Sequence, residues 1–156
     1  MSEERPGWHR HPNGGGWVQD TASVDKTAHI GPDAEVSGNA RVYGAAQVFG
    51  NAWVFGAARV FGAARVCGAA EVSGAARVSS PRHVLTVGPI GSEDQTLTLF
   101  RTETGYGVSV GCWHPDGATL DDLTAEVQRR APDHADEYEA AMALCRVRIA
   151  EWEAQR

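Results

Sequence analysis

Length, composition and charge already exclude several classes of protein. The chain has 156 residues and a formal net charge of −6, enough for one compact domain or two small ones. No stretch approaches the ~18 apolar residues of a membrane span, and the polar start MSEERPG does not resemble a secretory signal. Cys67, Cys112 and Cys145 are widely separated and odd in number, which predicts neither a disulfide framework nor a zinc motif and favours a reducing cytoplasm.

The charge is unevenly distributed along the chain. Residues 17–83 hold five acidic and six basic side chains, whereas residues 84–156 hold thirteen acidic side chains and six arginines. The first part is therefore nearly neutral and the second strongly acidic. An acidic C-terminal part argues against general binding of nucleic acid.

A six-residue repeat dominates the first half. A branched aliphatic residue returns at every sixth position, a small residue follows it four positions later, and glycine lies between them in the central units. The aliphatic positions are Val18, Val24, Ile30, Val36, Val42, Val48, Val54, Val60, Val66, Val72 and Val78, with Val84 in phase. A fixed short period predicts a solenoid, in which each coil buries its apolar edge against the next.

The unit from Val42 to Gln47 explains why this period forms a coil. Side chains alternate between the two faces of a strand, so Val42 and Ala46 can point inward while Tyr43 and Gln47 point outward. Gly44 occupies the turn because glycine adopts positive φ without a steric penalty. Three such edges would close a triangular coil with valines in its walls and alanines at its corners.

Residues 17–84 resemble the hexapeptide-repeat family, whose fold is the left-handed parallel β-helix. The segment Ile30-Gly31-Pro32-Asp33-Ala34 matches the family consensus, and later units carry glycine two places after the aliphatic, as in many uncharacterised phage and bacterial repeat proteins. Residues 85–156 are similar to a small tail found behind such repeats, with a Gly111-Cys112-Trp113 turn. The family includes acyltransferases, carbonic anhydrases, nucleotidyltransferase domains and inert scaffolds, so the resemblance implies a fold and no single activity.

The predicted fold class is mainly β, a short left-handed parallel β-helix followed by a small α+β domain with two helices. We expect residues 1–16 to form an N-terminal cap, residues 17–84 the β-helix and residues 85–156 the tail. Within the tail, residues 83–87 are typical of a strand, residues 88–94 of a turn, and residues 96–101 and 107–111 of a hairpin.

Two helices are predicted at the C-terminus. Leu120, Leu123 and Val127 are spaced for one face of a short helix with Thr119 as its N-cap, and Asp133 can cap a longer helix after Pro132. The longer helix carries an apolar stripe at alternating spacings of four and three, which we expect to pack on its own domain. The stripe consists of Tyr138, Met142, Cys145, Ile149 and Trp152.

Outward positions one coil apart should stack in columns on three walls. The predicted columns are Arg41, Arg59 and Arg77 with Tyr43 and Phe61 beside them; Trp17, Glu35, Trp53 and Glu71 with Phe55 nearby; and His29, Gln47, Arg65 and His83 with Phe49 nearby. The belt Tyr43, Phe49, Phe55 and Phe61 surrounds one level of the prism, and a soluble monomer should not expose such a belt. We expect one wall to pack on the tail and Phe49, Trp53 and Phe55 to form interfaces of a homo-oligomer, a trimer in our interpretation.

The stacked arginines require negative charge. Parallel strands place like charges about 4.8 Å apart, which is unfavourable unless something neutralises them. One source is a carboxylate of a neighbouring chain or of the acidic tail. The other is a small anionic ligand such as a signalling nucleotide, held by Arg41, Arg59 and Arg77 with Tyr43 or Phe61 stacking on its base.

The catalytic branches of the family fit poorly. A carbonic anhydrase needs three histidines around one zinc ion, and His29 and His83 would lie three coils apart. Acyltransferases use a histidine base, often beside a loop that interrupts the coils, and this repeat is unbroken. We therefore predict no catalytic residue, metal or cofactor, and a cytoplasmic, non-catalytic, oligomeric binding protein of phage type. The alternatives are an acyltransferase-type enzyme and a purely structural scaffold.

Overall fold

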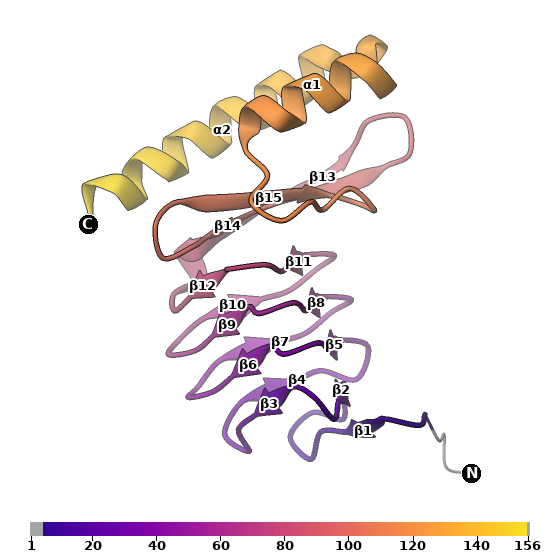
Figure 1. Ribbon diagram of the computed structural model, residues 1–156, viewed down its shortest axis with the longest axis vertical. Coiled ribbons are helices and arrows are strands. Elements are labelled where there is room, and N and C mark those ends of the chain that lie inside the picture. Colours follow the sequence, from indigo (N-terminus) through magenta and orange to yellow (C-terminus); the bar gives the residue numbers. More distant parts are fainter. Residues whose placement is uncertain (1–4, 156) are drawn as a thin grey trace.

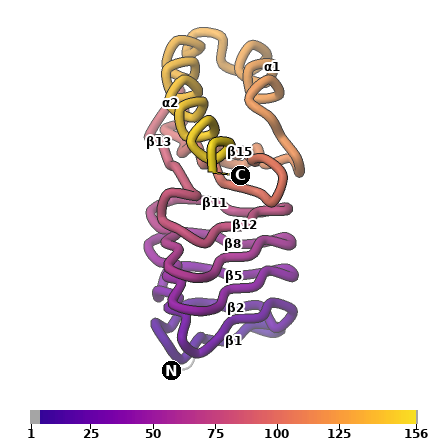
Figure 2. Tube along the Cα trace, turned by 90° about the vertical axis from the view of Figure 1, so that its left-hand side faces the viewer, coloured from indigo at the N-terminus to yellow at the C-terminus, as the bar shows by residue number. Residues whose placement is uncertain are grey.

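The computed structural model describes residues 5–155 as a parallel β-solenoid that carries a small antiparallel sheet and a pair of helices (Figure 1). This confirms the predicted mainly β fold with a tail of two helices. The solenoid, the sheet and the helices are stacked in that order along the long axis, which Figure 2 shows from the side.

Short strands form three parallel walls of the solenoid. The first wall holds β2 (Trp17–Gln19), β5 (Glu35–Val36), β8 (Trp53–Val54) and β11 (Glu71–Val72); the second holds β3 (Ser23–Val24), β6 (Arg41–Val42), β9 (Arg59–Val60) and β12 (Arg77–Val78); the third holds β4 (His29–Ile30), β7 (Gln47–Val48) and β10 (Arg65–Val66). Each residue pairs with the one a full coil later, as Val36 does with Val54 and Val54 with Val72. The aliphatics from Ile30 to Val78 and the alanines from Ala28 to Ala70 are almost completely buried, as predicted.

Glycines allow the turns of successive coils to approach closely. Gly56 has φ of +66°, and a Cβ added there would lie 2.9 Å from the backbone nitrogen of Gly74. Gly68 has nearly the same φ, +65°, but faces open space. The same turn therefore strains any side chain by its conformation, and a following coil adds a close contact with its backbone.

Residues 8–16 cover the N-terminal end of the solenoid. Strand β1 (Trp8–Arg10) pairs antiparallel with β2. The Gly16 amide donates to the Ile30 carbonyl at 2.9 Å, and the Ile30 amide donates to the Asn13 carbonyl at 3.0 Å. The buried His11 ring donates from Nε2 to the Ala28 carbonyl at 2.8 Å. These bonds satisfy backbone groups that an open end would leave without partners.

The antiparallel sheet covers the other end and presents different side chains to its two faces. It contains β13 (Val84–Ile90), β14 (Gln95–Arg101) and β15 (Tyr106–Val110) in that order. Phe100 joins the solenoid core, whereas Leu97 and Leu99 belong to the core beneath the helices. Because side chains alternate along a strand, β14 supplies both cores at once.

Hydroxyl groups of this sheet satisfy the last strand of the first wall. The Glu71 amide donates to Thr98 Oγ1 at 3.1 Å, and Ser109 Oγ donates to the Glu71 carbonyl at 3.3 Å. Both hydroxyls lie on the side of the sheet that carries Phe100. The edge of β11 is thus closed by side chains in place of another strand.

Helix α1 (Leu120–Arg130) begins as predicted. Thr119 is its N-cap, and the Thr119 and Asp122 side chains form a reciprocal capping box. Helix α2 (Ala135–Ala154) buries the predicted stripe, with Ile149 only half-buried. The predicted cap Asp133 is wrong: Asp133 lies in a short 3₁₀ helix, η2 (Pro132–His134), and His134 occupies the N-cap position without a side-chain hydrogen bond.

The boundary between solenoid and sheet also differs from the prediction. His83 does not extend the third wall, because Pro81 opens a 3₁₀ helix, η1 (Pro81–His83), where the repeat ends. Buried His83 instead accepts a hydrogen bond at Nδ1 from the Ser79 amide at 3.1 Å. The strand predicted at residues 83–87 starts at Val84 and continues to Ile90, which leaves only residues 91–94 for the turn. Among residues 5–155, neither helix is long and apolar enough to cross a bilayer.

Candidate functional site

The second wall of the solenoid brings the three predicted arginines together. Arg41 pairs in register with Arg59, and Arg59 with Arg77, on the parallel strands β6, β9 and β12. All three side chains are exposed. The Cα atoms of successive arginines are therefore one strand spacing apart, about 4.8 Å.

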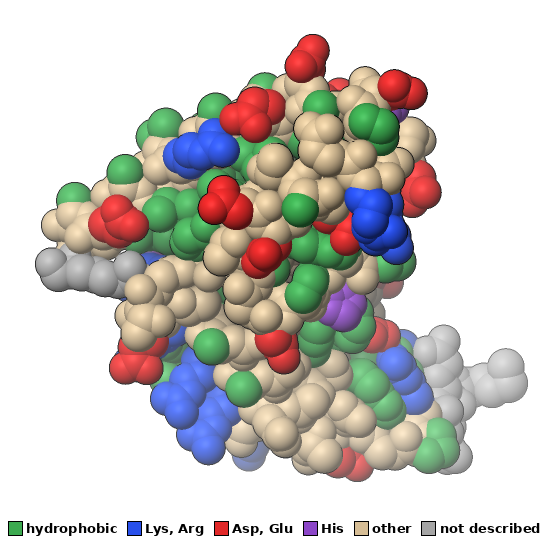
Figure 3. Space-filling model, turned by 45° about the horizontal axis from the view of Figure 1, so that its top comes forward, with side chains coloured by type: hydrophobic (Ala, Val, Ile, Leu, Met, Phe, Trp, Pro, Cys, Tyr) green, Lys and Arg blue, Asp and Glu red, His purple; other side chains and the backbone are tan. Residues whose placement is uncertain are grey.

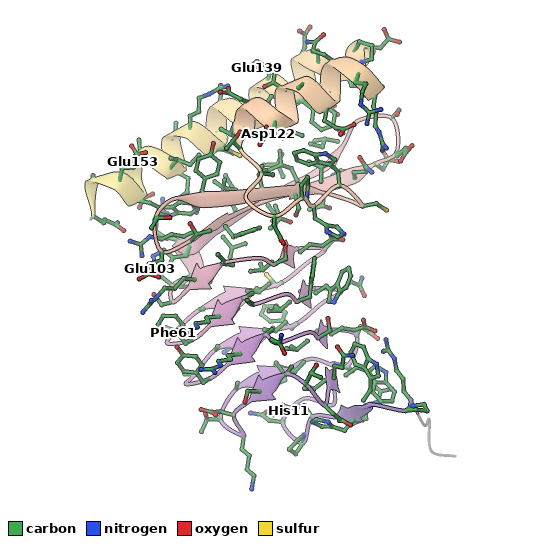
Figure 4. The ribbon with its side chains drawn as sticks, in the orientation of Figure 1. His11, Phe61, Glu103, Asp122, Glu139 and Glu153 are labelled. Atoms are coloured by element: carbon green, nitrogen blue, oxygen red, sulfur yellow. The ribbon has the colours of Figure 1, made fainter. Side chains whose placement is uncertain are left out.

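Among residues 5–155, an ion pair with a carboxylate is found at only one end of this arginine ladder. Arg77 Nη1 lies 3.9 Å from Glu103 Oε1, which belongs to the loop between β14 and β15. In Figure 4 Glu103 lies directly above Phe61, at the upper end of the solenoid. Within residues 5–155, Arg41 and Arg59 have no ion-pair partner. The tail therefore places a carboxylate near the last arginine, and the other two remain available.

Tyr43 and Phe61 form a stacked pair beside the ladder. Their ring centroids are 5.0 Å apart and their planes differ by 5°. The Arg77 guanidinium lies 5.6 Å from the centroid of Phe61. Phe61 thus has Tyr43 and Arg77 as neighbours, whereas Tyr43 has no second ring or cation partner among the described residues. Of the two predicted stacking residues, Tyr43 is therefore the one whose second ring face is available to a ligand.

Trp53 and Phe55 pack partly against the chain's own tail. Their rings stack at 4.0 Å, and the edge of His114 meets Phe55 at 5.1 Å and Trp53 at 6.2 Å. Trp53 Nε1 also donates to Ser37 Oγ at 2.9 Å. Both aromatic residues remain half-exposed, as does Phe49 on the third wall. The structure thus separates the predicted interface residues onto two walls, one of them touched by the tail.

Neither Glu103 nor His114 was identified from the sequence. Glu103 falls in the loop predicted between the hairpin strands, but nothing in its spacing indicates which wall that loop reaches. His114 follows the Gly111–Trp113 turn and carries no periodic signal. Both contacts depend on the position and orientation of the tail relative to the solenoid.

Glu71 is the last residue of the column that also contains Trp17, Glu35 and Trp53. Its carboxyl group lies in an unusual environment. Its Oε2 atom is buried and has no hydrogen-bond partner. Burial raises the pKa of this carboxyl group, and the nearby positive charge of His114 partly offsets the rise. Glu71 lies beneath the tail and contributes no charge to the arginine ladder on the next wall.

The histidines are engaged in local contacts. His29 Nδ1 lies 3.3 Å from Asn13 Oδ1, and exposed His9 pairs with Asp20 at 2.8 Å. Burial lowers the pKa of His83, and the charge of Arg101 lowers it further. Residues 5–155 contain no group of three or more His, Cys, Asp or Glu side chains placed to hold a metal ion.

A cavity of about 200 Å³ lies in the tail, away from the ladder. Its lining includes Cys112, Trp113, Glu126, Arg130 and Tyr138. Arg130 is already paired with Glu126 at 3.0 Å, and burial raises the pKa of Tyr138. The cavity therefore lacks the free cationic groups that distinguish the second wall.

Comparison with known proteins gave no match: no family model, no curated protein and no solved structure is similar enough to the chain to assign it.

Proposed function

We propose that this chain is a non-catalytic, oligomeric binding protein whose second wall holds an anionic ligand. One observation carries the proposal: Arg41 and Arg59 stand in register on neighbouring strands and have no carboxylate partner within residues 5–155. Like charges at this separation repel by about 1 kcal/mol in bulk water and by more near a protein surface. A bound anion would convert that repulsion into attraction.

The chemistry of the wall favours a phosphate group. Guanidinium groups donate two parallel hydrogen bonds, which suit phosphate and carboxylate oxygens. Tyr43 supplies an aromatic face next to Arg41 and Arg59, and aromatic faces stack on nucleobases. A small nucleotide, with phosphates on the ladder and its base on Tyr43, satisfies both features.

The wall is open on one chain, so the proposal includes a second chain that closes the site. Phe49, Trp53 and Phe55 are half-exposed on the two other walls, where neighbouring chains could cover them. Prisms of the hexapeptide-repeat family, which this repeat resembles, commonly assemble as trimers. The proposal is therefore a cytoplasmic trimer in which the ligand lies between the second wall of one chain and another wall of the next.

Isothermal titration calorimetry with cyclic and linear nucleotides tests the proposal. Arg59→Ala should weaken binding ten- to a hundredfold or more, because losing a charge-assisted hydrogen bond costs roughly 1.5–3 kcal/mol. Arg65→Ala is the matched control. Arg65 is exposed in the same Ala-Ala-Arg-Val sequence context but lies on the third wall, so this variant should bind like the wild type.

Two results would overturn the ligand assignment. One is equal binding by Arg59→Ala and wild type. The other is no heat with any nucleotide, combined with dissociation of the Arg59→Ala oligomer, which would identify the ladder's partner as a carboxylate of a neighbouring chain.

A further inference from the structure

The cavity in the tail lies where the β13–β14 turn, the end of β15, α1 and the start of α2 meet. Its volume is about 200 Å³. Pockets for drug-sized molecules measure roughly 300–1,000 Å³, so this one has room for a smaller molecule, such as one aromatic ring with a short chain. Buried Val110, Leu123 and Val127 make its apolar wall together with the ring of Trp113.

Tyr138 brings an unpartnered polar group to this cavity. The residue is only 4% exposed, yet its hydroxyl group has no hydrogen-bond partner among residues 5–155. The hydroxyl oxygen lies against Gly91, where an added Cβ would be 2.5 Å from it. Buried hydroxyl groups are normally hydrogen-bonded. One that lines a cavity and lacks a partner therefore indicates where a polar atom of a ligand binds.

The charges around this hydroxyl group favour a cation. Arg130, the basic residue of the lining, already pairs with Glu126 at 3.0 Å. Glu93 also lines the cavity and forms no ion pair within residues 5–155. Burial raises the pKa of Tyr138, and the negative charges of Glu137 and Glu93 raise it further because their potential reaches the hydroxyl group. The same potential attracts a positively charged ligand.

The tail as a whole carries the same sign of charge. Residues 84–156 hold thirteen acidic side chains and six arginines. On the face that Figure 3 shows, acidic side chains are spread over the upper part of the molecule, where the helices lie, and basic ones are few. Such a field concentrates small cations near the surface and repels anions. The tail and the second wall therefore attract ligands of opposite charge.

We propose that this cavity binds a small primary amine with an apolar body. The ammonium group donates a hydrogen bond to the Tyr138 hydroxyl oxygen and is attracted by the Glu93 carboxylate. The apolar body lies against Trp113, Leu123 and Val127. The site is distinct from the arginine ladder and does not depend on the ligand proposed there.

Isothermal titration calorimetry with three probes of similar size tests the class of ligand. Phenethylamine, phenethyl alcohol and hydrocinnamate end in a cationic, a neutral and an anionic group. The amine should bind at least about tenfold more tightly than the other two, because a hydrogen bond to a charged group is the stronger one and the anion is repelled. No heat with the amine, or equal affinity for all three probes, would overturn the proposal.

Tyr138→Phe tests the hydroxyl group. It should weaken amine binding about ten- to a hundredfold, because it removes a hydrogen bond to a charged group. The melting temperature of the free protein should be unchanged or raised, since the hydroxyl group has no partner to lose. Wild-type affinity for the amine, or a lowered melting temperature, would contradict this role.

Glu93→Gln tests the local charge. It should weaken amine binding about two- to fivefold, because Glu93 is exposed and exposed ion pairs contribute little. Glu153→Gln is the matched control: it removes the same charge from an exposed position at the opposite end of α2 and should bind the amine like the wild type (Figure 1). Equal weakening by both variants would mean that only the general charge of the tail acts, and would overturn the site.

Alkylation of the cysteines locates the bound amine. Exposed Cys112 lines the cavity, whereas exposed Cys67 lies on the solenoid. Saturating phenethylamine should therefore slow the labelling of Cys112 by iodoacetamide and leave the rate at Cys67 unchanged, as read by peptide mass spectrometry. An unchanged rate at Cys112 under saturation would place the amine elsewhere and overturn the assignment.

Discussion

The solenoid and the tail use their surface side chains in opposite ways. Coils of the solenoid are joined by backbone hydrogen bonds and buried valines and alanines, and Arg41, Arg59 and Arg65 form no ion pair within residues 5–155. In the tail and at its boundary with the solenoid, surface arginines form ion pairs with acidic side chains, as in Arg82–Glu151 and Arg146–Glu139. The three solenoid arginines are thus not held by ion pairs among the described residues, which leaves them free for binding.

The sharpest test of this contrast compares two neighbouring residues of β10. Val66→Asp should abolish folding, because a buried unpaired charge costs about 5 kcal/mol or more. Arg65→Asp, one position away and exposed, should change stability by less than ~0.5 kcal/mol. Soluble yield and circular dichroism distinguish them. A folded Val66→Asp protein would contradict the solenoid core.

Two adjacent residues of β14 test how the tail is attached. Phe100→Ala should cost about 3–5 kcal/mol and Leu99→Ala about 2–5 kcal/mol. Hydrogen exchange should then separate them: Phe100→Ala should expose amides of β11 and β12, and Leu99→Ala those of α1 and α2, because the side chains serve different cores. Loss of protection in the same region for both variants would mean that the two cores unfold as one.

Two turn glycines test the stacking of coils. Gly68→Ala should cost about 1–2 kcal/mol through its left-handed backbone alone. Gly56→Ala should cost more, because the new Cβ would also meet Gly74 at 2.9 Å. Urea unfolding measures both. Equal destabilisation would show that contact between coils adds nothing at this turn.

The smallest expected effect concerns the pH dependence of stability and Glu71. Its raised pKa means that folding disfavours the ionised carboxyl group. The stability that this group contributes is therefore complete below its unfolded pKa of about 4.3 and is lost as pH rises through the higher folded value. Glu71→Gln should raise the melting temperature at pH 7–8 and have little effect near pH 4. A melting temperature that is lowered at neutral pH would show that Glu71 is stabilising when charged.

Much of the solenoid could be predicted because each six-residue unit places the same residue types in the same local structure. The aliphatic position of Val54 recurs in every unit and the glycine position of Gly56 in the central units, so their burial and turn geometry follow from the period. The inner stripe of α2 is predictable for the same reason. His83 keeps the period but not the conformation: Ser80 and Arg82 stand where earlier units have the turn glycine and the buried alanine, and the chain forms η1 there.

The contacts between the two units could not be predicted. The alternation in β14 separates Phe100 from Leu99, but it does not say which face meets the solenoid. Glu103 reaches Arg77 and His114 reaches Phe55 only because the sheet sits across the last coil. Such long-range contacts leave no periodic trace in the sequence.

Native mass spectrometry of the purified protein tests the proposed binding wall most directly, because it reports subunit number and retained ligand together. We expect an oligomer that carries additional mass of a small anion, lost in Arg59→Ala and kept in Arg65→Ala. A bare monomer at micromolar concentration, or a retained ligand that Arg59→Ala does not release, would contradict the account.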